Sequence, residues 1–164
     1  MKIRIIILVI ICLILLVTAR IGLSIKYGRY ITVSRGIGIM IPFSTEIECK
    51  DSHGGFHGDG ECVIKVYFSD EQATKFKKKI NKNSHWNQLP MPDRLQKVVG
   101  ACMDKNMYVP IIENGYYFFK DRHSKADDKY NPNEMFEEDR GSSNYTVAVF
   151  DIDENILYFY ELDT

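Results

Sequence analysis

The segment from residue 51 to residue 61 carries the densest group of side chains that could do chemistry. Two imidazoles and three carboxylates lie there among four glycines: Asp51, His53, His57, Asp59 and Glu61. Imidazole and carboxylate together suit zinc, manganese or iron, so His53, His57 and Asp59 are candidate ligands of a divalent metal. The other interpretation is a glycine-rich hairpin whose His and Asp side chains bond to its own backbone. Because no HExxH helix or CxxC pair accompanies the ligands, we expect the hairpin without a cofactor, and a zinc or manganese ion is the alternative.

Two cysteines flank this segment. The pattern Cys49-x3-His53-x3-His57-x4-Cys62 formally holds the two Cys and two His of a closed zinc site, but its spacing differs from that of zinc fingers. If residues 55 and 56 lie at the centre of the loop, Cys49 and Cys62 face each other across a hairpin and could form a disulfide. We expect a disulfide before zinc, and two free buried thiols remain an equal alternative.

A second polar group, Asp121-Arg122-His123, follows the apolar run Tyr116–Phe119. Arg122 and His123 could bind an anion or join the glycine-rich segment in one cleft, and the alternative is ordinary solvated charge at a strand end. The candidate binding residues are therefore Asp51, His53, His57, Asp59, Arg122 and His123. No catalytic residue is predicted, because the chain contains no G-x-S-x-G nucleophile elbow and no nucleophile–base arrangement. This favours a protein that is not an enzyme.

The first 25 residues are typical of a membrane anchor or export signal. Lys2 and Arg4 precede the run Ile5–Val17, which has no polar residue and no aromatic. A helix over residues 5–25 would be roughly 31 Å long, enough for a hydrocarbon core of about 30 Å if Arg20 reaches the headgroups. We expect an uncleaved single-pass anchor at residues 5–25 in the cell membrane, with the following domain outside the cytoplasm. The alternative is secretion after cleavage of the leader near residue 19 or residue 24.

Charge argues against a nucleic-acid partner. The formal net charge of the 164-residue chain is −1, and it becomes −3 if Lys2 and Arg4 are lost with a cleaved leader. Five lysines between residues 75 and 82 could form a membrane-surface or nucleic-acid patch. Because Phe76 belongs to the expected buried stripe and no arginine is interleaved with these lysines, we expect a solvated helix face instead.

Alternation of apolar and polar residues predicts strands after the leader. Three hairpins are expected: Thr45–Lys50 with Glu61–Phe68, Val109–Ile112 with Tyr116–Lys120 around Asn114-Gly115, and Tyr145–Ile152 with Ile156–Leu162. Tyr30–Val33 and Ile37–Ile41 are expected to form short strands or an irregular lead-in. The polar segment 121–143 is expected to be a loop, with a functional lid as the alternative.

Two helices are expected between the strands. The first is capped by Ser69 and Gln72, with Ala73, Phe76 and Ile80 on its buried stripe. The second begins near residue 92 and continues to about residue 104. The fold class is therefore α+β: an N-terminal transmembrane or signal helix (residues 1–25), then one soluble domain (residues 26–164). That domain should hold a mainly antiparallel sheet of about five strands and two helices on one side of it.

The run Asp51-Ser52-His53-Gly54-Gly55-Phe56-His57-Gly58-Asp59-Gly60 resembles a loop in a group of small, uncharacterised exported or membrane-anchored proteins of low-GC Gram-positive bacteria. In that group a hydrophobic leader precedes the loop D-x-H-G-G-F-H-G-D-G. The resemblance extends to Asn114–Tyr117, Asp121–His123 and Leu157–Leu162, and so covers most of the chain after the leader. It implies a shared fold and location but no activity. Cysteines that flank the loop are not part of that group's pattern.

These observations together favour a membrane-anchored extracytoplasmic domain that binds a protein, a peptide or a component of the cell envelope. An aromatic C-terminal sheet and the absence of a nucleophile–base arrangement motivate this interpretation. The alternative is a metal-dependent enzyme or metal sensor built on residues 51–61.

Overall fold

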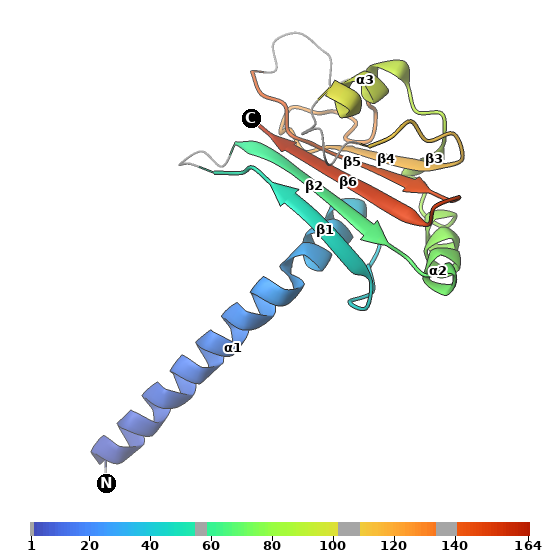
Figure 1. Cartoon of the computed structure of the whole chain (residues 1–164). Coiled ribbons are helices and arrows are strands. Elements are labelled where there is room, and N and C mark those ends of the chain that lie inside the picture. The colour runs from blue at the N-terminus through green and yellow to red at the C-terminus, as the bar shows by residue number, and fades with distance from the viewer. Residues whose placement is uncertain (1, 55–58, 102–108, 134–140) are drawn as a thin grey trace.

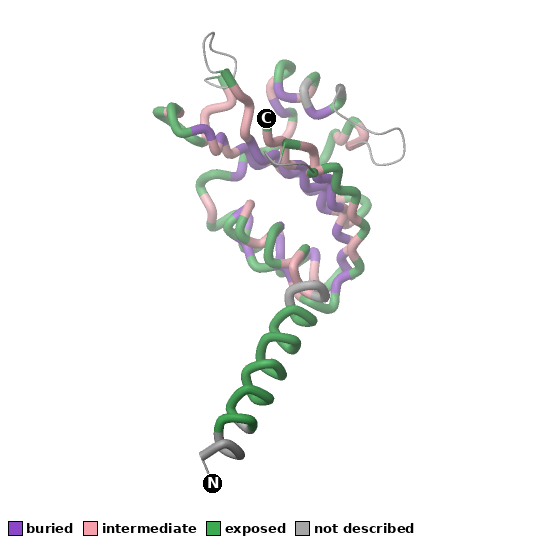
Figure 2. The backbone as a smooth tube through the Cα atoms, turned by 90° about the vertical axis from the view of Figure 1, so that its left-hand side faces the viewer, coloured by how far each residue is buried: buried purple, intermediate pink, exposed green. Residues whose placement is uncertain are grey.

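The computed structural model describes residues 2–54, 59–101, 109–133 and 141–164. Within these residues one antiparallel sheet lies between two layers of helix, and a long N-terminal helix projects away from it (Figure 1). In the view turned by 90°, the buried backbone is concentrated in the sheet and in the helix segments that face it (Figure 2). The expected α+β class with a mainly antiparallel sheet is confirmed.

The sheet in the described residues has six strands rather than about five, in the order β1-β2-β6-β5-β4-β3, and all neighbours are antiparallel. The strands are β1 (Glu46–Asp51), β2 (Gly60–Tyr67), β3 (Trp86–Gln88), β4 (Gly115–Asp121), β5 (Tyr145–Asp151) and β6 (Ile156–Asp163). The β1–β2 and β5–β6 hairpins are the ones that the alternation predicted. The last strand of the chain, β6, lies at the centre of the sheet between β2 and β5.

The third expected hairpin is wrong. Residues 109–112 form no strand, and β4 pairs instead with β5 and with β3. The reason lies at Gly115, which opens β4 rather than a tight turn. A Cβ at this position would collide with the carbonyl oxygen of Phe150, so only glycine lets the two backbones approach so closely.

The helix α1 (Lys2–Ile37) extends much further than the expected leader. The predicted strands or irregular lead-in at Tyr30–Val33 are wrong, because these residues belong to α1, and the expected boundary at residue 26 lies inside the helix. The last turns of α1 are buried: Val33 and Ile37 are both 0 % exposed and pack on the same face of the sheet as Phe159. A helix satisfies the backbone hydrogen bonds of these residues and also presents one apolar stripe to the sheet.

The helix α2 (Asp70–Ile80) begins as predicted. The Ser69 side chain accepts from the backbone N–H of Gln72, and the Gln72 side chain accepts from the backbone N–H of Ser69, which completes a capping box. Ala73, Phe76 and Ile80 are buried against the sheet face that α1 also covers. This helix and the end of α1 therefore form one layer.

The helix α3 (Asp93–Ala101) lies on the opposite face of the sheet, so the expectation of both helices on one side is wrong. Its buried residues Leu95 and Val99 pack with Val147 and Tyr160, whose side chains point away from α1 and α2. Successive residues of a strand point to opposite faces, so a sheet with apolar residues at adjacent positions, as in β5, requires cover on both sides. The part of the expected helix beyond Ala101 lies outside the described residues.

The polar segment after β4 packs on the sheet over its described part. Tyr130 stacks on His85 with ring centroids 3.5 Å apart, and it meets the buried Phe118 edge-on at 6.0 Å. The Asp121 N–H donates to the Lys129 carbonyl at 2.7 Å. Residues 122–133 are therefore held by the domain, and residues 134–140 lie outside the described residues.

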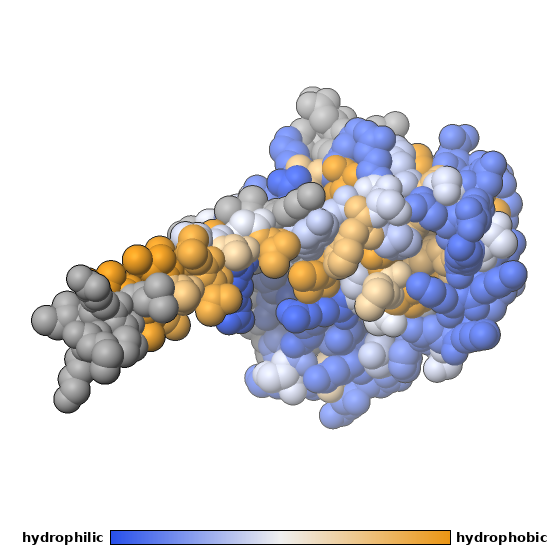
Figure 3. Space-filling view, turned by 90° about the horizontal axis from the view of Figure 1, so that it is seen from below, coloured by the Kyte–Doolittle hydropathy of each residue, from blue (hydrophilic) through white to orange (hydrophobic). Residues whose placement is uncertain are grey.

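Large aliphatic side chains between Ile6 and Leu23 are exposed on α1, and Figure 3 shows them as a continuous apolar surface. No single helix in the described residues meets both the length and the hydropathy typical of a membrane span. The two parts of α1, Val9–Leu23 and Tyr27–Ile37, meet these criteria together, with a bend of 62° between them.

The contact between α1 and the sheet yields the first prediction. A Cβ on Gly36 would lie 2.5 Å from Cε2 of Phe159, whose ring is fully buried and cannot move away freely. We expect Gly36→Ala to lower the free energy of unfolding by roughly 1–3 kcal/mol, as overpacking in cores does. Denaturant unfolding of the full chain in detergent measures this.

Gly28→Ala is the matched control, because a Cβ at Gly28, in the same helix, meets nothing within 4 Å. It should leave stability unchanged or raise it by up to about 1 kcal/mol through helix propensity. Equal stability of the two variants would contradict the described packing of α1.

Candidate functional site

The strands β1 and β2 carry the glycine-rich segment at one end of the sheet. Ser52 closes the base of this loop: its N–H and its hydroxyl both donate to the Glu61 carbonyl, at 2.8 and 3.1 Å, and its Oγ accepts from the Glu61 N–H at 2.9 Å. The Ser52 hydroxyl is thereby engaged with backbone and is not positioned as a nucleophile. His57 and residues 55, 56 and 58 lie outside the described residues.

His53 lies between two carboxylates. Its Nδ1 is 2.7 Å from Oδ1 of Asp51, and its Nε2 is 3.2 Å from Oδ2 of Asp163 at the end of β6. A neutral imidazole has one N–H donor, so only the protonated ring donates to both carboxylates at once. Both ring nitrogens are used within the protein, so a metal ion could bind His53 only by displacing a carboxylate.

Arg122 joins the same group through Asp163. Its Nη1 lies 2.9 Å from Oδ1 of Asp163, and its Nη2 donates to the Leu162 carbonyl at 3.0 Å. The Nε of Arg122 is 3.8 Å from Oε1 of Glu161. We call the group Asp51, His53, Arg122, Glu161 and Asp163 the polar cluster. It ties the glycine-rich loop, the end of β4 and the end of β6 together.

Burial and charge act in opposite directions on the carboxylates of the polar cluster. Burial raises the pKa of Glu161, and the Arg122 charge and the Thr146 hydroxyl, which donates to Oε1 at 3.1 Å, only partly oppose this. Burial would also raise the pKa of Asp51, but the hydrogen bonds from the ring and backbone N–H of His53, with its charge, lower it overall. The pKa values of these two carboxyls are therefore shifted in opposite directions.

The other predicted site residues lie apart from the polar cluster. Asp59 is exposed, and its carbonyl accepts from the Gly54 N–H at 3.4 Å. His123 is buried in a turn, where its N–H donates to Asp121 at 2.8 Å and its Nδ1 accepts from the Lys125 N–H at 3.2 Å. The structure thus brings together Asp51, His53 and Arg122 and gives His123 a role in local structure.

Sequence reasoning missed the two acidic members contributed by β6. Glu161 and Asp163 are two residues apart, so they point to the same face of the sheet. Acidic residues at period-two spacing at the end of an otherwise apolar strand were the available signal. The sequence does not show which distant cation these carboxylates pair with, because that pairing depends on β6 lying between β2 and β5.

Chemically, the polar cluster is suited to holding chain segments together rather than to catalysis. In the part of the chain that the structure describes, no group of three or more His, Cys, Asp or Glu side chains could hold a metal ion. A metal site that uses His57 stays a prediction, because that residue lies outside the described ranges.

Cys49 and Cys62 are free thiols that lie near each other. The register pairs Cys49 with Ile64 and Cys62 with Asp51, so the two cysteines are diagonal neighbours rather than opposite each other as expected. Diagonal positions are typically about 7–8 Å apart between Cα atoms, beyond the usual span of a disulfide. The Cys62 thiol instead hydrogen-bonds Cys49 and lowers the pKa of Cys49 to about 7, while the same bond and burial raise the pKa of Cys62.

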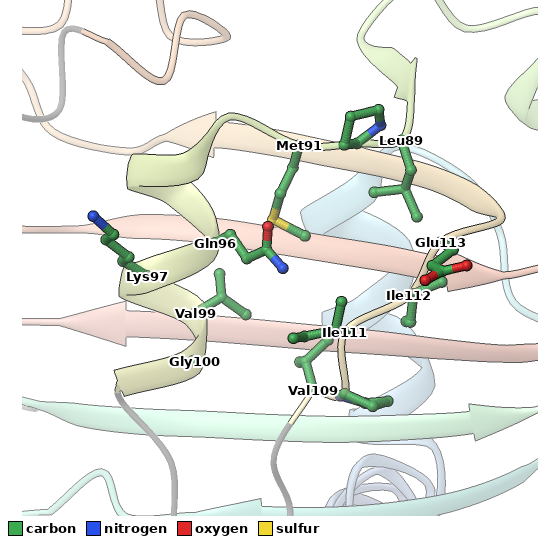
Figure 4. Close-up of a pocket in the computed structure, with 12 residues that line it drawn as sticks. Leu89, Met91, Gln96, Lys97, Val99, Gly100, Val109, Ile111, Ile112 and Glu113 are labelled. Atoms are coloured by element: carbon green, nitrogen blue, oxygen red, sulfur yellow. The ribbon is translucent and has the colours of Figure 1, made fainter.

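An apolar groove lies on the opposite face of the sheet, over the side that α3 covers (Figure 4). It has a volume of about 430 Å³ and lies between α3 and residues 109–113 (Figure 4). Its apolar lining comes from Leu89, Pro90, Met91, Val99, Val109, Pro110, Ile111 and Ile112, and its polar lining from Gln96, Lys97 and Glu113. Ile111 is 81 % exposed, so an aliphatic side chain stands open to solvent at the rim.

In comparisons with known proteins, no family model, no curated protein and no solved structure matches this chain.

The raised pKa of Glu161 predicts a pH-dependent effect of Glu161→Gln. A carboxyl whose folded pKa exceeds its unfolded value near 4.5 stabilises the fold below that value, and this contribution is lost as pH rises through the folded pKa. The glutamine variant has no such loss. We therefore expect its stability relative to wild type to increase as pH rises above about 4.5, measured by denaturant unfolding.

Glu154→Gln, an exposed carboxylate in the β5–β6 turn, is the control and should show a flatter difference. A Glu161→Gln variant that loses relative stability as pH rises would show that the charged form of Glu161 is the favoured one.

The hydrogen bond between the thiols predicts that Cys49 reacts near neutral pH. We expect its alkylation rate by iodoacetamide to be half-maximal at about pH 7, because the thiolate is the nucleophile. Cys62→Ala removes the donor and should move this midpoint toward the ordinary value of 9.0. Peptide-resolved mass spectrometry separates Cys49 from the other cysteines, and Cys12→Ser is the control. A wild-type midpoint near 9.0 would contradict the hydrogen bond.

Proposed function

We propose that this protein is a membrane-anchored extracytoplasmic domain that binds an apolar peptide segment in the groove between α3 and residues 109–113. The observation that carries the proposal is the groove itself, with Ile111 at 81 % exposure on its rim. An open aliphatic side chain beside a concave apolar surface is typical of an interaction site.

The chemistry of the groove favours a peptide over a phosphorylated or sugar ligand. Its volume of about 430 Å³ accommodates a few side chains, and eight of its twelve lining residues are aliphatic, Met or Pro. Lys97 and Glu113 carry opposite charge at the rim, and Gln96 offers both a donor and an acceptor to a peptide backbone. Among the described residues that line the groove Lys97 is the only cation, whereas an anionic ligand would need a cluster of them.

Anchoring through α1 is supported by its surface. Aliphatic side chains from Ile6 to Leu23 are about half exposed or more, and water would disfavour so much apolar area. Lys2 and Arg4 at the amino end favour retention of that end in the cytoplasm. We therefore place the domain outside the cytoplasm of the single-pass protein. Secretion after cleavage of the leader is the alternative.

The groove then faces away from the membrane. The end of α1 packs on one face of the sheet, and α3 with its groove lies on the other face (Figure 1). The expected ligand is therefore a partner protein or an envelope peptide on the extracytoplasmic side.

A peptide library tests this proposal. Full-length protein in lipid nanodiscs is used to select displayed peptides, and the affinity of a selected peptide is measured by fluorescence polarisation. We expect peptides with aliphatic or aromatic side chains, and at least about tenfold weaker binding to Ile111→Lys, because one anchor side chain is worth about 1.4 kcal/mol or more.

Met40→Lys is the matched control, since Met40 is similarly exposed, at 73 %, but lies on the other side of the domain. It should leave peptide affinity unchanged. Enrichment no better than on empty nanodiscs, or equal binding to both variants, would rule out the groove as a peptide site.

A further inference from the structure

Three exposed apolar side chains surround the point where α1 enters the domain. Ile31 on α1 is 37 % exposed, and Met40 and Phe43 in the following segment are 73 % and 57 % exposed. All three line one depression of about 430 Å³, which we call the α1-exit patch. In Figure 3 apolar surface continues from the projecting part of α1 onto this side of the domain.

The patch is held in place by the segment that folds back along α1. The Ile41 N–H donates to Oγ of Ser34 at 2.9 Å, and the Tyr30 hydroxyl donates to the Thr45 carbonyl at 2.7 Å. The first bond fixes the residue that follows Met40, and the second fixes Thr45, two residues after Phe43. The exposure of Met40 and Phe43 is therefore a built feature of the fold.

Aromatic rings collect at the same place. The Phe43 ring lies 4.7 Å from that of Tyr27 and 5.5 Å from that of Tyr30, centroid to centroid. Tyr27 comes directly after the apolar stretch of α1. Tyrosines are enriched where a membrane-spanning helix meets the headgroup region, because the ring is apolar and the hydroxyl is polar.

Lysines of α2 and of the turn after it adjoin the patch through Met40. Lys78 and Lys79 line a depression with Met40, and Lys79 and Lys82 line another with it. The Lys79 ammonium donates to the Met40 carbonyl at 3.2 Å. Met40 thus belongs both to these depressions and to the α1-exit patch, which Arg35 also lines.

We propose that the α1-exit patch, with Lys78, Lys79 and Lys82 around it, rests on the surface of an anionic lipid bilayer. This inference depends on the proposed membrane anchor, since α1 must enter the same bilayer. The apolar surface of α1 continues into the patch, and this favours a lipid bilayer over a protein as its partner. Met40 and Phe43 then reach the boundary of headgroups and acyl chains, and the lysines contact lipid phosphates. The domain is thereby held against the membrane with the peptide groove turned outward.

Tryptophan fluorescence in proteoliposomes tests the inference. Met40→Trp in the full chain is reconstituted in vesicles of phosphatidylcholine and phosphatidylglycerol, with part of the lipid brominated. The native Trp86 is buried in the core and supplies a constant background. We expect the new indole to emit at shorter wavelength than in water and to be quenched by brominated lipid, most by bromine close to the headgroup.

Ile111→Trp is the matched control, because Ile111 is equally exposed in the free domain but lies on the opposite face of the sheet. Its indole should be quenched by aqueous iodide and not by brominated lipid. Equal iodide quenching of both variants would overturn the proposal. Protection of Met40→Trp from iodide without quenching by brominated lipid would also overturn it, and would indicate a protein partner or a second copy of the chain.

Failure of the anchor and failure of the patch give different results. Protein that alkaline carbonate releases from the vesicles refutes the anchor, whereas retained protein with a solvent-exposed Met40→Trp refutes the patch alone. In the Met40→Trp background, Lys78→Gln with Lys82→Gln should weaken lipid quenching in vesicles that contain phosphatidylglycerol, and Lys97→Gln with Lys125→Gln should not. An equal loss with both lysine pairs would contradict the role of the α2 lysines.

Discussion

The close packing of the last turns of α1 on the centre of the sheet is the contact on which the rest of the molecule depends. Gly36 allows the helix backbone to approach the ring of Phe159, while Val33 and Ile37 fill the space on either side. Interiors are packed at crystal-like density, so this fit leaves one orientation of helix against sheet. That orientation decides which face of the domain lies near α1, where the segment after α1 must turn, and which face remains open on the far side.

The polar cluster fixes the other end of β6. Asp163 bridges His53 from the β1–β2 loop and Arg122 from the end of β4. The arrangement is a network of charge and hydrogen bonds. Its members are partly shielded from water except Asp51, which is exposed. Electrostatic bonds there are stronger than at an open surface, and an unpaired member would be unfavourable.

Much of the fold could be predicted from local pattern. Alternation located the β1–β2 and β5–β6 hairpins, and Ser69 with Gln72 located the start of α2, because these signals depend on neighbours in sequence. The predicted hairpin at Asn114-Gly115 failed because Gly115 is required for a close approach to Phe150, which lies far along the chain. The lead-in at residues 30–33 failed similarly: β-branched and aromatic residues were interpreted as strand, while burial against the sheet stabilises them as helix.

Prediction of the site succeeded for local signals and failed for contacts between distant residues. Asp51, His53 and Arg122 were found by residue type and spacing, but their shared partner Asp163 and the paired Glu161 required knowledge of strand order. Cys49 and Cys62 are diagonal rather than opposite each other because the hairpin register pairs Cys49 with Ile64. Because one step of register changes every cross-strand neighbour, a disulfide proposed from loop symmetry alone rests on an assumption that the sequence does not constrain.

The two exposed apolar regions differ in a way that bears on function. Ile111 stands beside an apolar groove on the face of the sheet remote from α1, with one cation and one anion among the lining residues. Met40 and Phe43 adjoin a helix that exposes aliphatic side chains between Ile6 and Leu23, and lysines line depressions together with Met40. Apolar area of that extent beside lysines is costly in water, but it is favourable where hydrocarbon and phosphate meet. The fold thus places the proposed membrane-facing surface and the proposed peptide groove on opposite faces of a single sheet.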